Sequence, residues 1–153
     1  MMDRDGRKRV MLVEDDAPLA EYLTVRLRRG GYDARWARDG LVAMKMLDDV
    51  APHAILLDLA MPNLDGFGVL ARLDADDVHR RVPVMVLSAR HNAGDIRRAI
   101  DMGARDYLSK PFDDAMLLKR LARLMRSAPA MAVQGVAPAP EPAEAEADAT
   151  AWI

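Results

Sequence analysis

The amino-acid sequence predicts an α/β fold, with a doubly wound, parallel five-stranded sheet and helices on both of its faces. Two observations lead to this prediction. Short apolar runs alternate along the chain with longer stretches in which apolar residues recur at helical spacing. The apolar runs are also nearly continuous, which is typical of parallel strands that helices cover on both sides.

The strands are expected at five apolar runs, over residues 10–13, 32–36, 54–57, 82–87 and 107–108. Pro83 must lie at the start of its strand, because proline cannot donate to a sheet ladder. Each helix is expected to bury apolar residues three or four positions apart. These residues are Leu19, Leu23 and Leu27; Leu41, Met44 and Leu47; Val69, Leu70 and Leu73; Ile96, Ala99 and Ile100; and Leu117, Leu118, Leu121, Leu124 and Met125.

Local signals set the helix boundaries. Asp16 is the expected N-cap of the first helix, and Gly30 ends it, because these residue types favour helix termini. The second helix is expected to end near Pro52, the third to span residues 66–75 and the fourth to end at Gly103.

Composition excludes several classes of protein. The chain has no cysteine, which excludes disulfide frameworks, thiolate metal sites and thiol nucleophiles. The three histidines, His53, His79 and His91, are scattered, so they are interpreted as surface or structural residues. No apolar run is long enough to span a membrane or to act as a secretory signal. We therefore expect a cytoplasmic protein that binds no membrane.

The chain divides by composition into three parts. Residues 1–8 form a charged arm, residues 9–126 form the expected domain, and residues 127–153 form an Ala/Pro/Glu-rich acidic tail or linker that is expected to be disordered. The tail contains no Lys or Arg.

Polar residues follow four of the expected strands. Glu14 and Asp15 come after the first strand, Asp58 after the third, Ser88 after the fourth and Lys110 after the fifth. The carboxyl ends of parallel strands meet at one edge of a sheet, where such folds bind ligands. Carboxylate oxygens suit Mg²⁺, a carboxylate can act as nucleophile in phosphoryl transfer, and Lys and Ser can bind phosphoryl oxygens.

Around these residues the sequence resembles the receiver domain of bacterial two-component response regulators. The matching stretches are residues 11–16, 56–66, 86–90 and 103–112, and the resemblance covers residues 9–126. It implies a flavodoxin-like (βα)5 fold with strand order 2-1-3-4-5, an order known for this type of sheet.

The resemblance also implies a metal and phosphorylation site. Asp58 would be the phosphoacceptor, and Asp15 would bind Mg²⁺ directly. Glu14 would act through water, and the backbone carbonyl of Ala60 would complete the ligands that the protein supplies to the metal.

Four further residues are assigned by the same resemblance. Ser88 would be the hydroxyl that turns toward the phosphoryl group, and Lys110 would pair with a phosphoryl oxygen. The Lys110–Pro111 peptide would be cis. Tyr107 would be the aromatic residue that moves with Ser88, although on its own it is expected to be a half-buried strand residue.

The implied function is a binding switch rather than an enzyme. A sensor histidine kinase or phosphotransfer protein would phosphorylate Asp58, and the surface of helix four, strand five and helix five would then change its output partner. Small phosphodonors would also serve, and the phosphoryl group would be lost by self-dephosphorylation.

The protein is expected to be a monomer or a weak dimer before phosphorylation. In winged-helix regulators this surface dimerises through charge pairs. Asp106 and Arg120 match that pattern, whereas Arg105 and Met116 stand where acids are usual.

Two alternatives remain open from the sequence. A Mg²⁺-dependent aspartyl phosphohydrolase would need an acid two residues after its nucleophile, where this chain has Ala60. Alternatively, the chain is the receiver and linker of a longer winged-helix transcription factor, with residues 151–153 as the first strand of its effector domain. No DNA-reading element is recognised anywhere in the chain, so nucleic-acid binding is not assigned to it.

Trp36, in the second expected strand, is interpreted as a residue that packs at the edge of the sheet.

Overall fold

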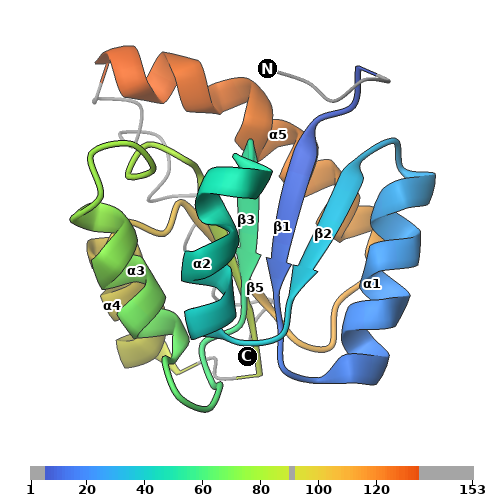
Figure 1. Cartoon of the computed structure of the whole chain (residues 1–153), viewed down its shortest axis with the longest axis horizontal. Helices are drawn as coiled ribbons and strands as arrows, with labels where there is room; N and C mark the ends of the chain where they lie inside the picture. Colours follow the sequence, from blue (N-terminus) through green and yellow to red (C-terminus); the bar gives the residue numbers. More distant parts are fainter. Residues whose placement is uncertain (1–5, 90–91, 135–153) are drawn as a thin grey trace.

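The computed structural model of the chain describes residues 6–89 and 92–134. Its five strands form one parallel sheet in the order β2-β1-β3-β4-β5, as Figure 1 shows in part. The strands are β1 (Arg9–Val13), β2 (Asp33–Ala37), β3 (Ala54–Leu57), β4 (Val84–Ser88) and β5 (Asp106–Ser109). The predicted fold class and strand order are therefore confirmed.

Within the described part of the chain, five helices cover the two faces of this sheet (Figure 1). Two helices, α1 (Ala17–Arg29) and α5 (Asp114–Gln134), pack on one face, where Leu23 and Leu121 share a core with Leu12 and Leu56 of the sheet. The other face carries α2 (Gly40–Val50), α3 (Gly66–Asp74) and α4 (Ala93–Asp101). Because helices bury both faces, the central strands are apolar on both, as the continuous runs predict.

Side chains next to the carboxyl edge of the sheet begin the helices. The carboxylate of Asp16 accepts the amide N–H of Leu19 at 3.2 Å, as predicted for the N-cap of α1. Asp39, Asp65 and Asn92 cap α2, α3 and α4 in the same way. Each cap satisfies an amide that the helix itself leaves without a partner, which fixes the direction in which the chain leaves the strand end.

The loop after β3 is held close to α3 by a glycine. A Cβ atom added at Gly66 would lie 2.5 Å from the carbonyl oxygen of Asp58 and 2.6 Å from the Cα of Leu59. The Gly66 amide also donates to the carbonyl of Leu59 at 2.8 Å. Only a residue without a side chain allows this approach, so Gly66 sets the position of the segment that follows Asp58.

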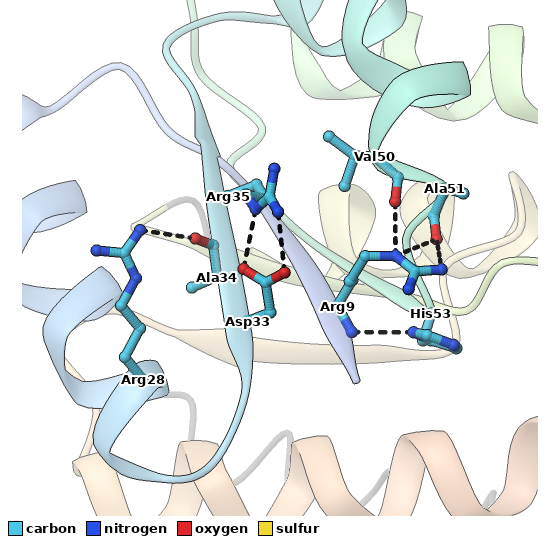
Figure 2. Close-up of polar contacts among 8 residues, drawn as sticks. All are labelled: Arg9, Arg28, Asp33, Ala34, Arg35, Val50, Ala51 and His53. Atoms are coloured by element: carbon cyan, nitrogen blue, oxygen red, sulfur yellow. Dashed lines mark hydrogen bonds and ion pairs between the residues drawn. The ribbon is translucent and has the colours of Figure 1, made fainter. Parts of the chain in front are cut away.

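At the opposite edge of the sheet, arginines tie loops to strands (Figure 2). The guanidinium of Arg9 donates to the carbonyls of Val50 and Ala51, at 2.7 and 2.9 Å, and so satisfies the end of α2. The Arg9 amide donates to Nδ1 of His53 at 2.9 Å. This edge is therefore structural, in keeping with the expectation for His53.

Two further polar contacts near this edge involve β2. In Figure 2, Arg35 pairs with Asp33 through two hydrogen bonds, and Arg28 donates to the carbonyl of Ala34. In the loop between α3 and β4, His79 is also structural, because it is buried and its Nδ1 lies 2.9 Å from the carboxylate of Asp76. His91 lies outside the described residues.

Three predicted side-chain positions are wrong. Leu41 and Ile100 are 39% and 44% exposed, because α2 turns Ala43 against the sheet instead and α4 turns Ala99, which was correctly predicted to be buried. The small residues let the helices approach closely, and the neighbouring larger ones are left at the surface. Tyr107 is wholly buried rather than half-buried, because α4 covers its face of β5.

The structure also moves several boundaries. Tyr32, Val82 and Pro83 precede their strands, as the bounds of β2 and β4 show. Helix α5 continues to Gln134, past the compositional boundary at Arg126. Alanine, the strongest helix former, recurs among residues 127–134 and favours extension of a helix that is already nucleated, whereas Pro129 in the same stretch lacks an amide donor and opposes it. The rest of the expected disordered tail, residues 135–153, lies outside the described residues.

Gly66→Ala is expected to destabilise the fold by about 1–3 kcal/mol, because the new methyl group would press on backbone atoms that cannot rotate away. Gly94→Ala is the matched control, since there the nearest atom is a side-chain oxygen of Asn92 at 3.3 Å. Chemical denaturation of both variants measures the difference. Equal free energies of unfolding would contradict the steric argument.

Candidate functional site

Five predicted site residues gather at the carboxyl edge of the sheet. Glu14 and Asp15 directly follow β1, Asp58 follows β3, Ser88 ends β4 and Lys110 follows β5. The backbone keeps these strand ends aligned, because the amide of Asp58 donates to the carbonyl of Val13 at 3.0 Å. The prediction that the residues converge on one edge is borne out by the register of the strands.

Glu14 is fixed by its carboxylate and by its backbone. One carboxylate oxygen accepts from Nζ of Lys110 at 2.7 Å, and the other accepts the amide of Asp16 at 3.2 Å. The Glu14 amide donates to the carbonyl of Ala37 at 3.1 Å. The carbonyl of Glu14 accepts from the indole Nε1 of Trp36 at 2.8 Å. The side chain of Glu14 is only 1% exposed, so the ion pair with Lys110 compensates for the burial of its charge.

Asp58 lies on the other side of the same lysine. Its carboxylate is 3.7 Å from Nζ of Lys110 and accepts a long hydrogen bond, 3.4 Å, from the amide of Ala60. The Asp58 side chain is 7% exposed. Lys110 is therefore shared by two buried carboxylates, and it lies closer to Glu14 than to Asp58.

Glu14, Asp15 and Asp58 fit a divalent cation. One ligand oxygen from each of the three lies within 4.8 Å of the others, and Asp15 is exposed to solvent. Hard carboxylate oxygens are the donors that Mg²⁺ prefers, and the ion usually keeps several waters, which the exposed side would admit. The donor set thus agrees with the predicted magnesium site.

The crowded charges change the proton affinity of Asp58. Burial raises the pKa of this carboxyl from 3.8 to about 7, and the neighbouring carboxylate of Glu14 adds to the rise. Lys110 and the amide of Ala60 oppose the shift without cancelling it. In the absence of metal, the ionised form of Asp58 is therefore costly to the folded protein.

Ser88 and Lys110 are joined through their backbones. The amide of Lys110 donates to the carbonyl of Ser88 at 2.9 Å, and Ser88 is wholly buried. The Lys110–Pro111 peptide is cis, which confirms the prediction from the sequence. Tyr107, wholly buried on β5, comes three residues before Lys110 in the chain.

Trp36 is the residue of this site that the sequence did not reveal. The sequence indicates only edge packing for this residue, whereas in the structure its indole donates to the backbone carbonyl of Glu14. An aromatic residue near the end of an edge strand gives no local sign of such a contact, because the partner lies 22 residues earlier in the chain.

Asp58→Asn is expected to stabilise the metal-free protein. The folded protein holds the Asp58 proton up to about pH 7, whereas the unfolded chain releases it near pH 4, so wild-type stability falls across this interval. The variant has no such loss. Its advantage should appear above pH 4, grow until about pH 7 and reach about 4 kcal/mol, since the pKa rises by about 3 units and each unit corresponds to about 1.4 kcal/mol.

The measurement is chemical denaturation in a chelator at several pH values. Asp33→Asn is the control with the opposite sign, because pairing with Arg35 lowers the pKa of Asp33 and its loss should not stabilise the protein. A difference between Asp58→Asn and wild type that stays constant from pH 4 to pH 8 would contradict the assignment.

Comparison with known proteins identifies the family. The family model of the response regulator receiver domain matches residues 10–122. The chain is 36% identical over 118 residues to a DNA-binding dual master transcriptional regulator, RpaA, of Synechocystis, covering 77% of this chain and 49% of that protein. It is 38% identical over 122 residues to the DNA-binding response regulator MtrA of Mycobacterium tuberculosis, covering 79% of this chain and 52% of that protein.

Solved structures agree with this assignment. The receiver domain of a sensor histidine kinase from Pseudomonas aeruginosa, with a magnesium ion coordinated in its active-site cleft, is 33% identical. The TM-score is 0.73, and the match covers 79% of this chain and 99% of that one. The crystal structure of a putative response regulator from Chloroflexus aurantiacus matches with a TM-score of 0.75 at 28% identity. This match covers 78% of this chain and 98% of that one.

The chain spans about half the length of the two DNA-binding relatives described above. Within the described residues, no helix is both long and apolar enough to cross a membrane. The sheet order, the polar residues at its carboxyl edge and the matched sequence lead to one conclusion: the chain belongs to the receiver domain family of two-component response regulators.

Proposed function

We propose that Asp58 accepts a phosphoryl group and that the domain is a switch driven by this modification. The observation that carries the proposal is the arrangement of three carboxylates and one ammonium at a single edge of the sheet. Asp58 faces Lys110 at 3.7 Å, and one carboxylate oxygen each of Glu14, Asp15 and Asp58 lies within 4.8 Å of the others. A bound metal ion and an ammonium stabilise the negative charge of a phosphoryl group during transfer, while carboxylates supply the nucleophile and hold the metal.

The proposed reaction starts from a phosphohistidine of a kinase or phosphotransfer protein. A carboxylate oxygen of Asp58 forms a bond to phosphorus while the phosphorus–nitrogen bond breaks, and the electron pair of that bond stays on the leaving imidazole. Bound Mg²⁺ would supply positive charge beside the phosphoryl oxygens and favour the ionised form of Asp58. Glu14, Asp15 and Asp58, with the backbone carbonyl of Ala60, would hold it.

Lys110 connects the site to the rest of the domain. In this structure its ammonium lies 2.7 Å from Glu14, and a phosphoryl group on Asp58 would offer it a second, more highly charged partner. The Lys110 amide is bonded to Ser88, so the two residues already share one backbone link. A shift of the Lys110 ammonium, together with a turn of the Ser88 hydroxyl, would carry the change to Tyr107 and to the surface of α4, β5 and α5.

The proposal is a binding switch rather than an enzyme with turnover. A phosphohydrolase with an aspartyl nucleophile needs a nearby acid to protonate the leaving group. Position 60, which would carry it, is an alanine. We therefore expect phosphorylation from small donors and self-dephosphorylation, without turnover of phosphate esters. The relatives named as DNA-binding regulators support an output through DNA, but the output partner of this chain is not assigned.

Incubation of the protein with acetyl phosphate and Mg²⁺ is expected to add one phosphoryl group, and intact-mass spectrometry measures it. Asp58→Asn should remain unmodified, and a chelator should suppress modification of the wild type. Asp65→Asn is the matched control, because Asp65 is an exposed carboxylate close in sequence whose role is to cap α3. Phosphate on Asp58→Asn would refute the assignment of the acceptor.

The charge pairs on the surface of α4, β5 and α5 bear on whether the protein forms a dimer. Asp106 is engaged within its own chain by Arg120 at 3.1 Å and by Arg123 at 3.9 Å. Arg120 is buried and also donates to the carbonyl of Tyr107, so it acts as a tie between β5 and α5. The charge pair that matches the usual dimer pattern is thus already formed inside one molecule, and each exposed pair across a dimer would contribute little.

We therefore expect the unphosphorylated protein to be a monomer or a weak dimer. Sedimentation velocity at micromolar concentrations, with and without acetyl phosphate, measures this. Met116→Glu, which restores the usual acid at an exposed position of α5, should strengthen association if that surface is used. A tight unphosphorylated dimer through this surface would refute the expectation.

A further inference from the structure

The contact between Trp36 and Glu14 lies where the sheet ends. Trp36 is on the edge strand β2, where it is paired in register with Leu12. Its indole Nε1 extends past the end of β1 and donates to the carbonyl of Glu14 at 2.8 Å. The Trp36 residue is 36% exposed, so its ring lies at the border between the sheet and solvent.

This contact takes the place of a sheet hydrogen bond. The last bond between the two strands runs from the amide of Glu14 to the carbonyl of Ala37 at 3.1 Å. Beyond it, the chain after β2 turns to begin α2, with Asp39 capping the amide of Val42 at 2.9 Å. The carbonyl of Glu14 belongs to a wholly buried residue, and a buried carbonyl needs a donor. The indole is that donor.

The bonded carbonyl is part of the peptide unit that joins Glu14 to Asp15. A peptide unit is planar, so fixing its oxygen also fixes the direction in which the Cα of Asp15 leaves it. Asp15 is exposed, in contrast to Glu14 and Asp58, and its own carboxylate has little packing to orient it. The orientation of the metal-binding turn therefore depends on the anchors of its backbone.

We propose that Trp36 is a positioning residue for the magnesium site. Its indole N–H holds the Glu14–Asp15 peptide so that Asp15 faces Asp58 before the metal binds. This role rests on the proposed magnesium site and adds to it a residue that touches neither the metal nor the phosphoryl group. A plain packing role for the ring, by contrast, requires its apolar area and not its N–H.

Trp36→Phe tests the role, because it keeps an aromatic ring and removes the donor. Isothermal titration of the unphosphorylated protein with Mg²⁺ should give a dissociation constant about three- to tenfold higher than in the wild type, as expected for the loss of one hydrogen bond. Tyr22→Phe is the matched control, because it removes the hydroxyl that an exposed aromatic of α1 donates to Asp114. Its magnesium affinity should equal that of the wild type.

A second measurement observes the contact without changing Trp36. Trp152 is the other tryptophan of the chain, so Trp152→Phe leaves a single indole signal in a ¹H–¹⁵N spectrum. This signal should shift during a Mg²⁺ titration with the midpoint found by calorimetry. The melting temperatures of metal-free wild type and Trp36→Phe are also compared. A purely structural role of Trp36 would lower the melting temperature of the variant and leave its magnesium affinity unchanged.

The outcomes separate the two proposals. A wild type that binds no Mg²⁺ overturns the proposed metal site and this role with it. A wild type that binds Mg²⁺, together with equal affinity in Trp36→Phe or an indole signal that does not respond, overturns the role of Trp36 alone. Weaker binding in Trp36→Phe, a responding indole and an unchanged Tyr22→Phe support it.

Discussion

The ammonium of Lys110 allows two carboxylates to be buried at the same edge of the sheet. Glu14 and Asp58 are almost wholly shielded from water, and each would repel the other without a cation between them. Burial and the neighbouring carboxylate of Glu14 raise the pKa of Asp58, and Lys110, which lies closer to Glu14 than to Asp58, opposes that rise without cancelling it. The carboxylates at this edge therefore repel one another, and a proton or a bound metal ion would relieve that repulsion, whereas a phosphoryl group would add negative charge. A switch requires a state of this kind, one that stays folded but responds strongly to a new charge.

Much of this site could be predicted because its residues follow strands in the chain. Apolar runs locate the strands, parallel strands end at one edge, and Glu14, Asp58 and Lys110 follow from that rule alone. The cap at Asp16 was predicted equally well, since a capping side chain acts on an amide three residues away. Signals of this kind are local, because the residues involved lie close together in the sequence.

The contacts that could not be predicted join residues far apart in the chain. Trp36 reaches the carbonyl of Glu14, and Arg9 reaches the end of α2, 41 residues later. Both contacts depend on how two elements lie in space, and neither residue type signals its partner. The burial of Tyr107 was underestimated for the same reason, because it depends on α4 and not on the neighbours of Tyr107 in the sequence.

The length of α5 has a mechanical consequence. The helix is 21 residues long, and its tie to β5 through Arg120 lies in its first half. Gln134 is therefore about 20 Å along the axis from that tie, at 1.5 Å for each residue. A tilt of α5 by about 10° at Arg120 would move Gln134 by roughly 3–4 Å over that length, apart from any bend that Pro129 introduces. The end of α5 would thus move further than its start in response to a small rearrangement beside Tyr107.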